Sequence, residues 1–442
     1  LQNLDISHCA LTNIDYIGNC KGLHMLTLHN LYNLNPINVY ARVPDNIGTL
    51  STLQVLTISY CNFTILPSSI GSLSALKELN ISSCQLEKLP ESIHILKSLQ
   101  ILKMSRLYKL TLLPKTFGSL SALKELYISL CALKTLPETI DGLKSLYKLE
   151  LVDLDILTIL PMSFGRLSAL KEMHISRCQL QTLPNSIGDL TSLRVLDIRS
   201  SFTMLPASFG NLSSLTSLEI NDCPLDKLPD SIGQLQSMHT LKLSNLQYCT
   251  MLPASICTLT SLRTLRLSHR PYTQLPQSFW ELTNITELGI DNINCEFIDK
   301  IQTMKDLLIL DLYSQPSESH GIRMAMIYKT WPQKLKYLTG ITLGIYWKEM
   351  ELPAYAKDMN NTDVLYMLHK QKKMEQDRTM AFVSGHHSRL GNKSPVALID
   401  ISAMTMIFEN VVPWTYNMPA SFTRGRELCS VCHPACTCAC VR

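Results

Sequence analysis

The chain has 442 residues, 46% of them hydrophobic, and its 40 basic and 36 acidic side chains leave a formal net charge of only +4. This balance gives the chain as a whole no attraction to nucleic acid or to an anionic membrane, so neither is expected as a partner. The longest apolar runs are shorter than the ~18 residues of a membrane-spanning helix, so no span is expected either.

One motif recurs along most of the chain. It reads LPSSIGSLSALKELNISSCQLEKLP at residues 66–90, and later copies follow every 22 to 24 residues. Self-similarity with this period predicts a solenoid in which each copy stacks on the next, and not a globule. Fourteen units result when the copies are aligned on the first apolar residue of the LxxLxIxxC block: Leu1, Leu23, Leu53, Leu76, Leu99, Leu123, Leu146, Leu170, Leu193, Leu215, Met238, Leu262, Ile285 and Leu307.

Each unit predicts one short strand and one short return segment. In residues 75–83 apolar and polar residues alternate, so Leu79 and Ile81 should point into the core and their neighbours outward. The next Leu-Pro ends the strand because proline lacks an N–H donor. The chain then turns and runs back along the other side as a short helix or 3₁₀ segment, as in residues 68–76. Fourteen strands at ~4.8 Å predict a concave parallel sheet ~65 Å long, bent into a leucine-rich repeat horseshoe of the α/β solenoid class.

The repeats divide the chain into three predicted regions. Residues 1–313 form the solenoid, residues 314–355 a degenerate repeat or C-terminal cap, and residues 356–442 a non-repeat tail. Within the tail a helix is predicted near 362–378, followed by a poorly ordered segment. An enlarged step between the second and third units predicts a protruding loop around residues 33–43. Because the chain begins inside a repeat, we also expect a further N-terminal domain before it.

The repeat resembles the leucine-rich repeat regions of plant nucleotide-binding disease-resistance proteins and of plant intracellular Ras-group repeat proteins. The resemblance covers residues 1–313 and is carried by Leu-Pro followed by SIG or SFG, where secreted plant receptors usually have Gly-x-Ile-Pro. It implies a cytoplasmic protein-interaction module of plant defence and signal transduction. The chain has no GxxxxGK[ST] phosphate loop, so the nucleotide switch of the disease-resistance family is not present in it.

The chain has fifteen cysteines, and those within the repeats are expected to be mostly structural. Cys84 and Cys131 lie two units apart, which corresponds to ~10 Å along the sheet and exceeds the ~7 Å Cα limit for a disulfide. Cys61 and Cys84, in adjacent units, could approach each other. We therefore predict buried reduced thiols whose S–H groups reach backbone carbonyls, which fits a reducing compartment.

The chain ends in CSVCHPACTCACVR, which contains soft metal ligands at zinc-like spacing: Cys429, Cys432, His433, Cys436 and Cys438. A zinc site usually draws a second pair of ligands from another segment, and the chain has no second CxxC. A flexible, reactive tail is therefore favoured over a metal site, and no cofactor is predicted.

The outward strand residues are predicted to form the binding face. Charges of both signs alternate along it, which suits a protein or peptide partner with complementary patches. The alternative for each residue is an ordinary solvated strand position. The candidate partner-binding residues are Glu78, Asn80, Lys103, Glu125, Tyr127, Lys148, Glu150, Glu172, His174, Asp197, Arg199, Glu219, Lys242 and Arg266.

No residue pattern indicates catalysis, and we do not expect an enzyme. The sequence has no nucleophile elbow, paired-carboxylate motif or HExxH, and His174 beside Glu172 is ordinary surface. Two other functions remain open. One is the targeting module of an enzyme whose catalytic part lies upstream. The other is an extracellular recognition or adhesion ectodomain, which is kept open by six Asn-x-Ser/Thr sequons at Asn62, Asn80, Asn211, Asn284, Asn360 and Asn392.

Overall fold

The computed structural model describes residues 1–8, 14–31, 42–246, 248–268, 275–291, 306–314 and 340–345, together with residues 300 and 304. The chain forms two compact units, one of Leu1–Ile293 with Thr303–Leu307 and one of Asn294–Gln302 with Leu308–Arg442. In the second unit, strands β14 (Ile309–Ser314) and β15 (Gly340–Ile345) pair in parallel. They occupy the positions of the fourteenth repeat and of the degenerate repeat after it.

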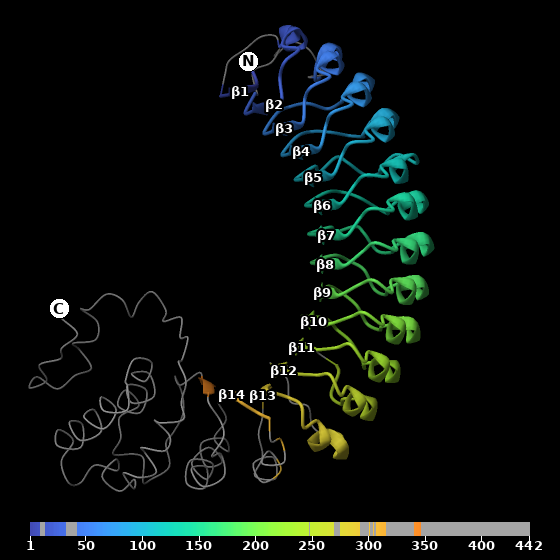
Figure 1. Cartoon of the computed structure of the whole chain (residues 1–442), viewed down its shortest axis with the longest axis vertical. Helices are drawn as coiled ribbons and strands as arrows, with labels where there is room; N and C mark the ends of the chain where they lie inside the picture. Colours follow the sequence, from blue (N-terminus) through green and yellow to red (C-terminus); the bar gives the residue numbers. More distant parts are fainter. Residues whose placement is uncertain are drawn as a thin grey trace, which may run out of the picture. The chain divides into compact units, whose positions relative to one another are not determined.

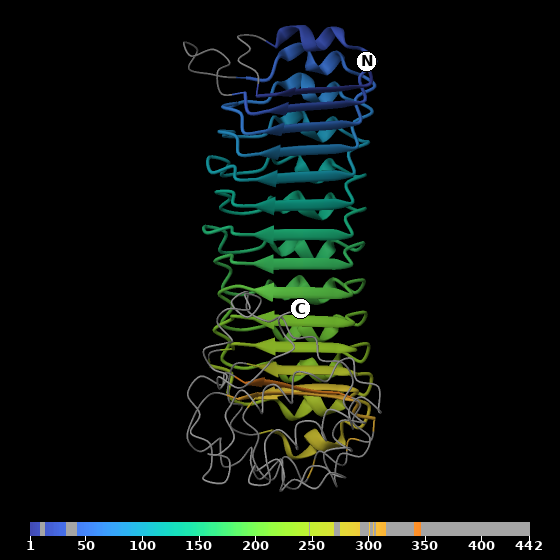
Figure 2. The same cartoon turned by 90° about the vertical axis from the view of Figure 1, so that its left-hand side faces the viewer.

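The first unit is a stack of repeats that each contribute one five-residue strand to a parallel sheet (Figures 1 and 2). The described strands follow one another in chain order without a crossover, which confirms the predicted solenoid. They are β1 (Asn3–Ser7), β2 (Met25–His29), β3 (Val55–Ser59), β4 (Glu78–Ser82), β5 (Ile101–Ser105), β6 (Glu125–Ser129), β7 (Lys148–Val152), β8 (Glu172–Ser176), β9 (Val195–Arg199), β10 (Ser217–Asn221), β11 (Thr240–Ser244), β12 (Thr264–Ser268) and β13 (Glu287–Asp291).

Short 3₁₀ helices form the outer side of this unit (Figure 1). Proline starts most of them. At Pro67 the backbone is extended (φ −70°, ψ 151°), and its carbonyl accepts a hydrogen bond of 3.1 Å from the Ile70 amide. The helices are η1 (Asp15–Asn19), η2 (Asp45–Thr49), η3 (Ser68–Ser72), η4 (Glu91–Ile95), η5 (Phe117–Ser119), η6 (Glu138–Gly142), η7 (Met162–Arg166), η8 (Asn185–Asp189), η9 (Ala207–Asn211), η10 (Asp230–Gln234), η11 (Ala254–Thr258) and η12 (Gln277–Glu281).

The core lies between the sheet and these helices. Leu79 and Ile81 of β4 are buried together with Ile70, Leu73 and Leu76 of the preceding return segment, as the period-two pattern predicts. Full burial of one such side chain contributes about 1.5–3 kcal/mol, and the stack repeats the same set on every rung. The core is therefore continuous from rung to rung, and the alternate residues of each strand lie on the inner side of the sheet.

The strand-end cysteines Cys84, Cys131, Cys178 and Cys223 are buried, and all eight described cysteines are free. The thiol of Cys131 donates to the Ser129 carbonyl at 3.3 Å and lies 3.9 Å from the Met104 carbonyl of the preceding rung. Burial raises the pKa of Cys84 to about 12 and the pKa values of the other three to about 11. These cysteines act as small apolar core residues, as the sequence predicts.

Several predictions concern residues outside the described part of the chain. The predicted loop around 33–43 falls there except for its last two residues, where Arg42 forms a parallel bridge with Ile65. The helix near 362–378 and the zinc-like cluster at the C-terminus also fall there and stay predictions. Within the described residues, no helix is both long enough and apolar enough to cross a membrane.

Candidate partner-binding face

The fourteen candidate residues all lie on strands β4 to β12, on the inner side of the first unit. This surface is called the concave face, and it consists of the first, third and fifth residue of each strand from β1 to β13. The register places Asn80 opposite Lys103, Lys103 opposite Tyr127, and Tyr127 opposite Glu150. The middle positions therefore form one continuous row across the sheet, as the repeat alignment predicts.

An aromatic cluster lies at the centre of this face. The Tyr127 ring has Lys103 on one neighbouring strand and Lys148 on the other, with ammonium-to-centroid distances of 5.7 and 5.4 Å. Its hydroxyl donates to Glu125 at 2.6 Å, and the Tyr147 hydroxyl donates to the same carboxylate. Cation–π contacts of this kind contribute ~0.5–1 kcal/mol at exposed sites. The ring is held from both sides and by its hydroxyl.

The same contacts shift the protonation equilibria of the cluster. Hydrogen bonds from Tyr127 and Tyr147 lower the pKa of Glu125. Burial, followed by the hydrogen bond to Glu125, raises the pKa of Tyr127, while the hydrogen bond to Glu125 is the main reason for the raised pKa of Tyr147. Glu125 therefore stays an anion and the two phenols stay neutral donors at physiological pH.

Ion pairs tie the rungs around this cluster together. Lys103 contacts Glu78 of β4 at 3.1 Å. Lys148 contacts Glu150 on its own strand at 3.1 Å and Glu172 of β8 at 3.9 Å. The hydrogen bond to Glu150 is the main cause of the raised pKa of Lys148. Each of these pairs is partly exposed and contributes only ~0–1 kcal/mol to stability, so its main effect is to orient the side chains.

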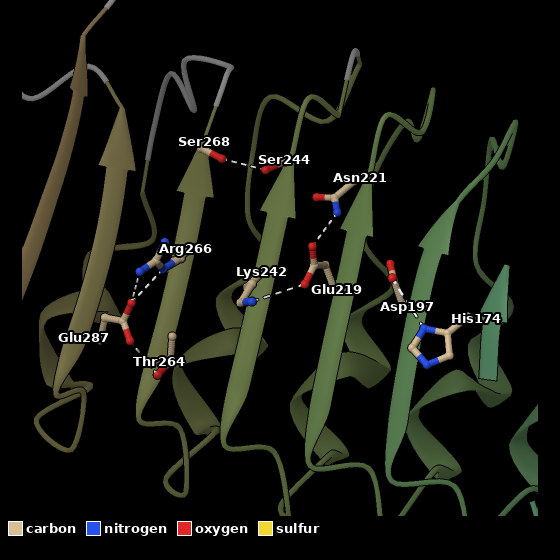
Figure 3. A network of polar contacts seen from close by, with 10 residues as sticks. All are labelled: His174, Asp197, Glu219, Asn221, Lys242, Ser244, Thr264, Arg266, Ser268 and Glu287. Carbon is tan, nitrogen blue, oxygen red and sulfur yellow. Dashed lines mark hydrogen bonds and ion pairs between the residues drawn. The ribbon is translucent and has the colours of Figure 1, made fainter. Parts of the chain in front are cut away.

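The pairing continues toward β13 (Figure 3). His174 Nδ1 lies 3.5 Å from an Asp197 oxygen, and the side-chain hydrogen bond to Asp197 is the main cause of the raised pKa of His174. Lys242 contacts Glu219 at 3.3 Å. Arg266 pairs with Glu287 of β13, which also accepts a hydrogen bond from Thr264. Every charged residue of the predicted set thus has a polar partner on its own or a neighbouring rung.

A second row of polar residues follows directly after the strands, and sequence reasoning missed it. Asp153, Arg177, Asp222 and Asn245 have φ values near +50°, which turns each side chain onto the rim of the concave face. Arg177 pairs with Asp153 through two nitrogens. Arg199 and Asn245 contact Asp222 at 2.8 and 2.7 Å. The available signal was the second x of the IxxC pattern, which is charged at Arg177 and Asp222.

The concave face is therefore organised before any partner arrives. Its charges neutralise one another in pairs, so it has no uniform field that would select a polyanion or a polycation. Among the described residues, no group of three or more His, Cys, Asp or Glu side chains is arranged to hold a metal ion. The face thus presents paired charges of both signs along its described strands.

Comparison with known proteins agrees with this architecture. The family described as Leucine-rich repeat region matches residues 69–176 and 210–353, more than half of the chain, and the family described as Leucine Rich Repeat matches residues 52–73. No curated protein sequence is significantly similar to the chain.

Solved structures share the fold. A leucine-rich repeat protein of Leptospira interrogans superposes with a TM-score of 0.56 and 24% identity, over 75% of this chain and 88% of that one. The plant peptide hormone receptor RGFR1, solved in complex with RGF2, has a TM-score of 0.52 and 24% identity, over 79% of this chain and 54% of that one. An internalin of Listeria monocytogenes has a TM-score of 0.52 and 18% identity, over 72% of this chain and 87% of that one. At these identities the likeness concerns the fold alone.

Proposed function

We propose that this chain, which belongs to the leucine-rich repeat family, is a recognition module that binds a protein or peptide partner on its concave face. The observation that carries the proposal is the cluster around Tyr127, with Lys103 and Lys148 over its ring and Glu125 on its hydroxyl. Energetic hot spots of protein interfaces are enriched in Tyr and lie near the centre of the interface. Tyr127 has this position on β6, near the middle of the thirteen strands.

The partner should carry charges of both signs at spacings that match the rungs. Because the ion pairs of the face are already formed, a partner's charged groups replace some of these contacts with contacts of their own. Long-range electrostatic attraction therefore adds little to the rate of association. The fixed side chains lose little conformational freedom on binding, and such preorganisation lowers the entropic cost of association. Specificity then resides in the order of charges from Glu78 to Glu287 more than in any single residue.

The proposed setting is the cytoplasm, in a plant immune-receptor-like protein or a signalling scaffold. Two features support it: the Leu-Pro followed by SIG or SFG, and the buried, unbridged thiols such as Cys131. Glycan analysis of the native protein tests this setting. Occupancy at Asn62 or Asn80 would contradict it and favour an extracellular ectodomain. Asn80 is informative because its side-chain amide already donates to Glu78 at 3.1 Å on the concave face.

The binding face is tested by recovering proteins from an extract of the source cells with the full chain and with two quadruple variants. In the first, Lys103, Tyr127, Glu150 and His174 are all replaced by Ala. In the second, exposed residues of the outer helices are replaced by Ala, namely Ser68, Glu138, Asn185 and Asp230.

A partner recovered by the outer-helix variant and by the unchanged chain, but lost by a folded concave-face variant, is the expected result. Undiminished recovery by the concave-face variant would exclude this surface. A single Tyr127→Phe substitution, which keeps the ring and removes the hydrogen bond to Glu125, should retain more binding than Tyr127→Ala.

A further inference from the structure

A second surface of the first unit has the opposite character to the concave face. It lies on the loops that follow the strands, which stack along one edge of the sheet (Figure 2). In each loop, one residue directly precedes the Leu-Pro that starts the next 3₁₀ helix, or Val-Pro in the case of Arg42. These residues are called the descending row: Arg42, Ile65, Lys88, Leu112, Thr135, Ile159, Thr182, Met204, Lys227 and Met251.

The descending row alternates in chemistry from rung to rung. After strands β3, β5, β7, β9 and β11 it carries large apolar side chains, exposed by between 37% at Ile65 and 61% at Met204. On the four intervening rungs it carries lysine or threonine, namely Lys88, Thr135, Thr182 and Lys227. The core therefore does not require an apolar residue here, because lysine or threonine occupies the same position on every second rung.

Further exposed apolar residues broaden the row on the same rungs. Tyr108 follows β5, Ile156 and Met162 follow β7, and Tyr248 follows β11, all with at least 42% of their surface exposed. Concentrated apolar patches on the surface of a soluble protein usually mark an interaction site. The charged residues of the concave face are paired with one another, whereas these side chains offer apolar area to a partner.

The spacing of the row defines the shape of that partner. Ile65 forms parallel bridges with Arg42 and with Lys88, so neighbouring positions are ~4.8 Å apart and apolar ones ~9.6 Å apart. Further along the stack, hydrogen bonds between the residues that directly precede the row keep the same register. The Lys134 amide, for example, donates to the Thr111 carbonyl at 3.1 Å. Seven residues of an α-helix rise ~10.5 Å, which matches the apolar spacing. On a β-strand the same face recurs every ~6.7 Å, which does not match.

We propose that the descending row is a docking surface for an amphipathic α-helix of a protein partner, with apolar residues seven apart and acidic residues between them. The acidic character follows from charge complementarity, because the row carries Arg42, Lys88 and Lys227 but no acidic residue. Neither Lys88 nor Lys227 takes part in the ion pairs found among the described residues. A polyproline ligand has a similar repeat of ~9.3 Å, but such ligands dock in grooves lined by aromatic residues, and the row itself is aliphatic.

The apolar surface is densest between Tyr108 and Met204. The three row positions within it, Leu112, Ile159 and Met204, span four rungs, or ~19 Å, which equals about 13 residues of helix. A 21-residue synthetic peptide of three heptads is therefore long enough as a probe. It carries Leu at two positions of each heptad, Glu at the flanking positions, and fluorescein at one end. A control peptide has the same composition with the Leu residues spread around the helix.

Fluorescence anisotropy with the full chain measures binding of both peptides. The patterned peptide should bind at least tenfold more tightly than the control peptide. The triple variant Leu112→Thr, Ile159→Thr and Met204→Thr should reduce its affinity at least tenfold. This variant is matched to the native stack, since Thr135 and Thr182 already occupy the same position on adjacent rungs. The concave-face quadruple variant should leave the peptide affinity unchanged, which separates this surface from the proposed function.

Results of three kinds would each overturn the proposal. The first is equal affinity for the patterned and control peptides, or an unchanged affinity in the triple Thr variant. The second is tighter binding of a polyproline peptide of the same length. The third is a sedimentation experiment in which the unchanged chain is a dimer and the triple Thr variant is a monomer, since a second copy of the chain would then occupy the row.

Discussion

Substitution of Gly118 by alanine tests how closely the rungs are packed. An added Cβ would lie 1.7 Å from the carbonyl oxygen of Thr139 and 2.6 Å from its carbonyl carbon, both on the backbone of the next rung. Cβ contacts in proteins essentially never fall below 3.0 Å, so helices η5 and η6 would have to separate by about 1.3 Å. Phe117 of η5 and Ile140 of η6 are both fully buried, so this separation would disturb the packing of the core around them.

The expected cost is about 1–3 kcal/mol of unfolding free energy, because strained core insertions fall in that range. It is partly offset by the ~0.4–1 kcal/mol that a Gly-to-Ala change contributes by restricting the unfolded chain. Gly22→Ala is the matched control. There the nearest atom to an added Cβ is the Leu1 carbonyl oxygen at 4.0 Å, so the same entropic term should leave stability equal or slightly increased.

Urea denaturation of the full chain, followed by circular dichroism, measures both variants against the unchanged protein. Gly118→Ala should shift the midpoint down and Gly22→Ala should not. If the two substitutions change the midpoint equally, the close approach of η5 and η6 is not a determinant of stability, and the reasoning fails.

Three further outcomes are expected. Residue-resolved alkylation by iodoacetamide at pH 8 should leave four buried thiols unmodified until denaturant is added, namely Cys84, Cys131, Cys178 and Cys223. The reason is that burial raises their pKa values. Labelling of these thiols in the folded chain would contradict this expectation. Since these thiols stay neutral in the fold but ionise near pH 9 when unfolded, stability should fall as pH rises from about 9 toward 11. In an NMR titration His174 should show a pKa above the usual ~6.5, and Asp197→Asn should lower that pKa. The stability contributed by the His174–Asp197 pair is fully present below ~6.5 and is lost as pH rises through the raised pKa of His174.

Much of the candidate site could be predicted because the repeat fixes register. A period of about 23 residues brings the same position of successive units onto neighbouring strands, so Asn80, Lys103 and Tyr127 had to lie side by side once the copies were aligned. The alternation of apolar and polar residues decided which face they occupy. The buried thiols followed from the same alignment, since strand ends two rungs apart are too distant for a disulfide.

The sequence by itself determined the stack, its sheet and the residues of the inner face. Only the tertiary structure decided which side chains contact one another. Arg177 reaches Asp153 because both residues adopt left-handed backbone conformations directly after their strands, and no local pattern specifies the contact between them. The tertiary structure likewise decided that the apolar residues of the descending row form one surface. Its members are separated by 45 to 47 residues of chain, and they become one surface only because stacking places every second loop ~9.6 Å from the last.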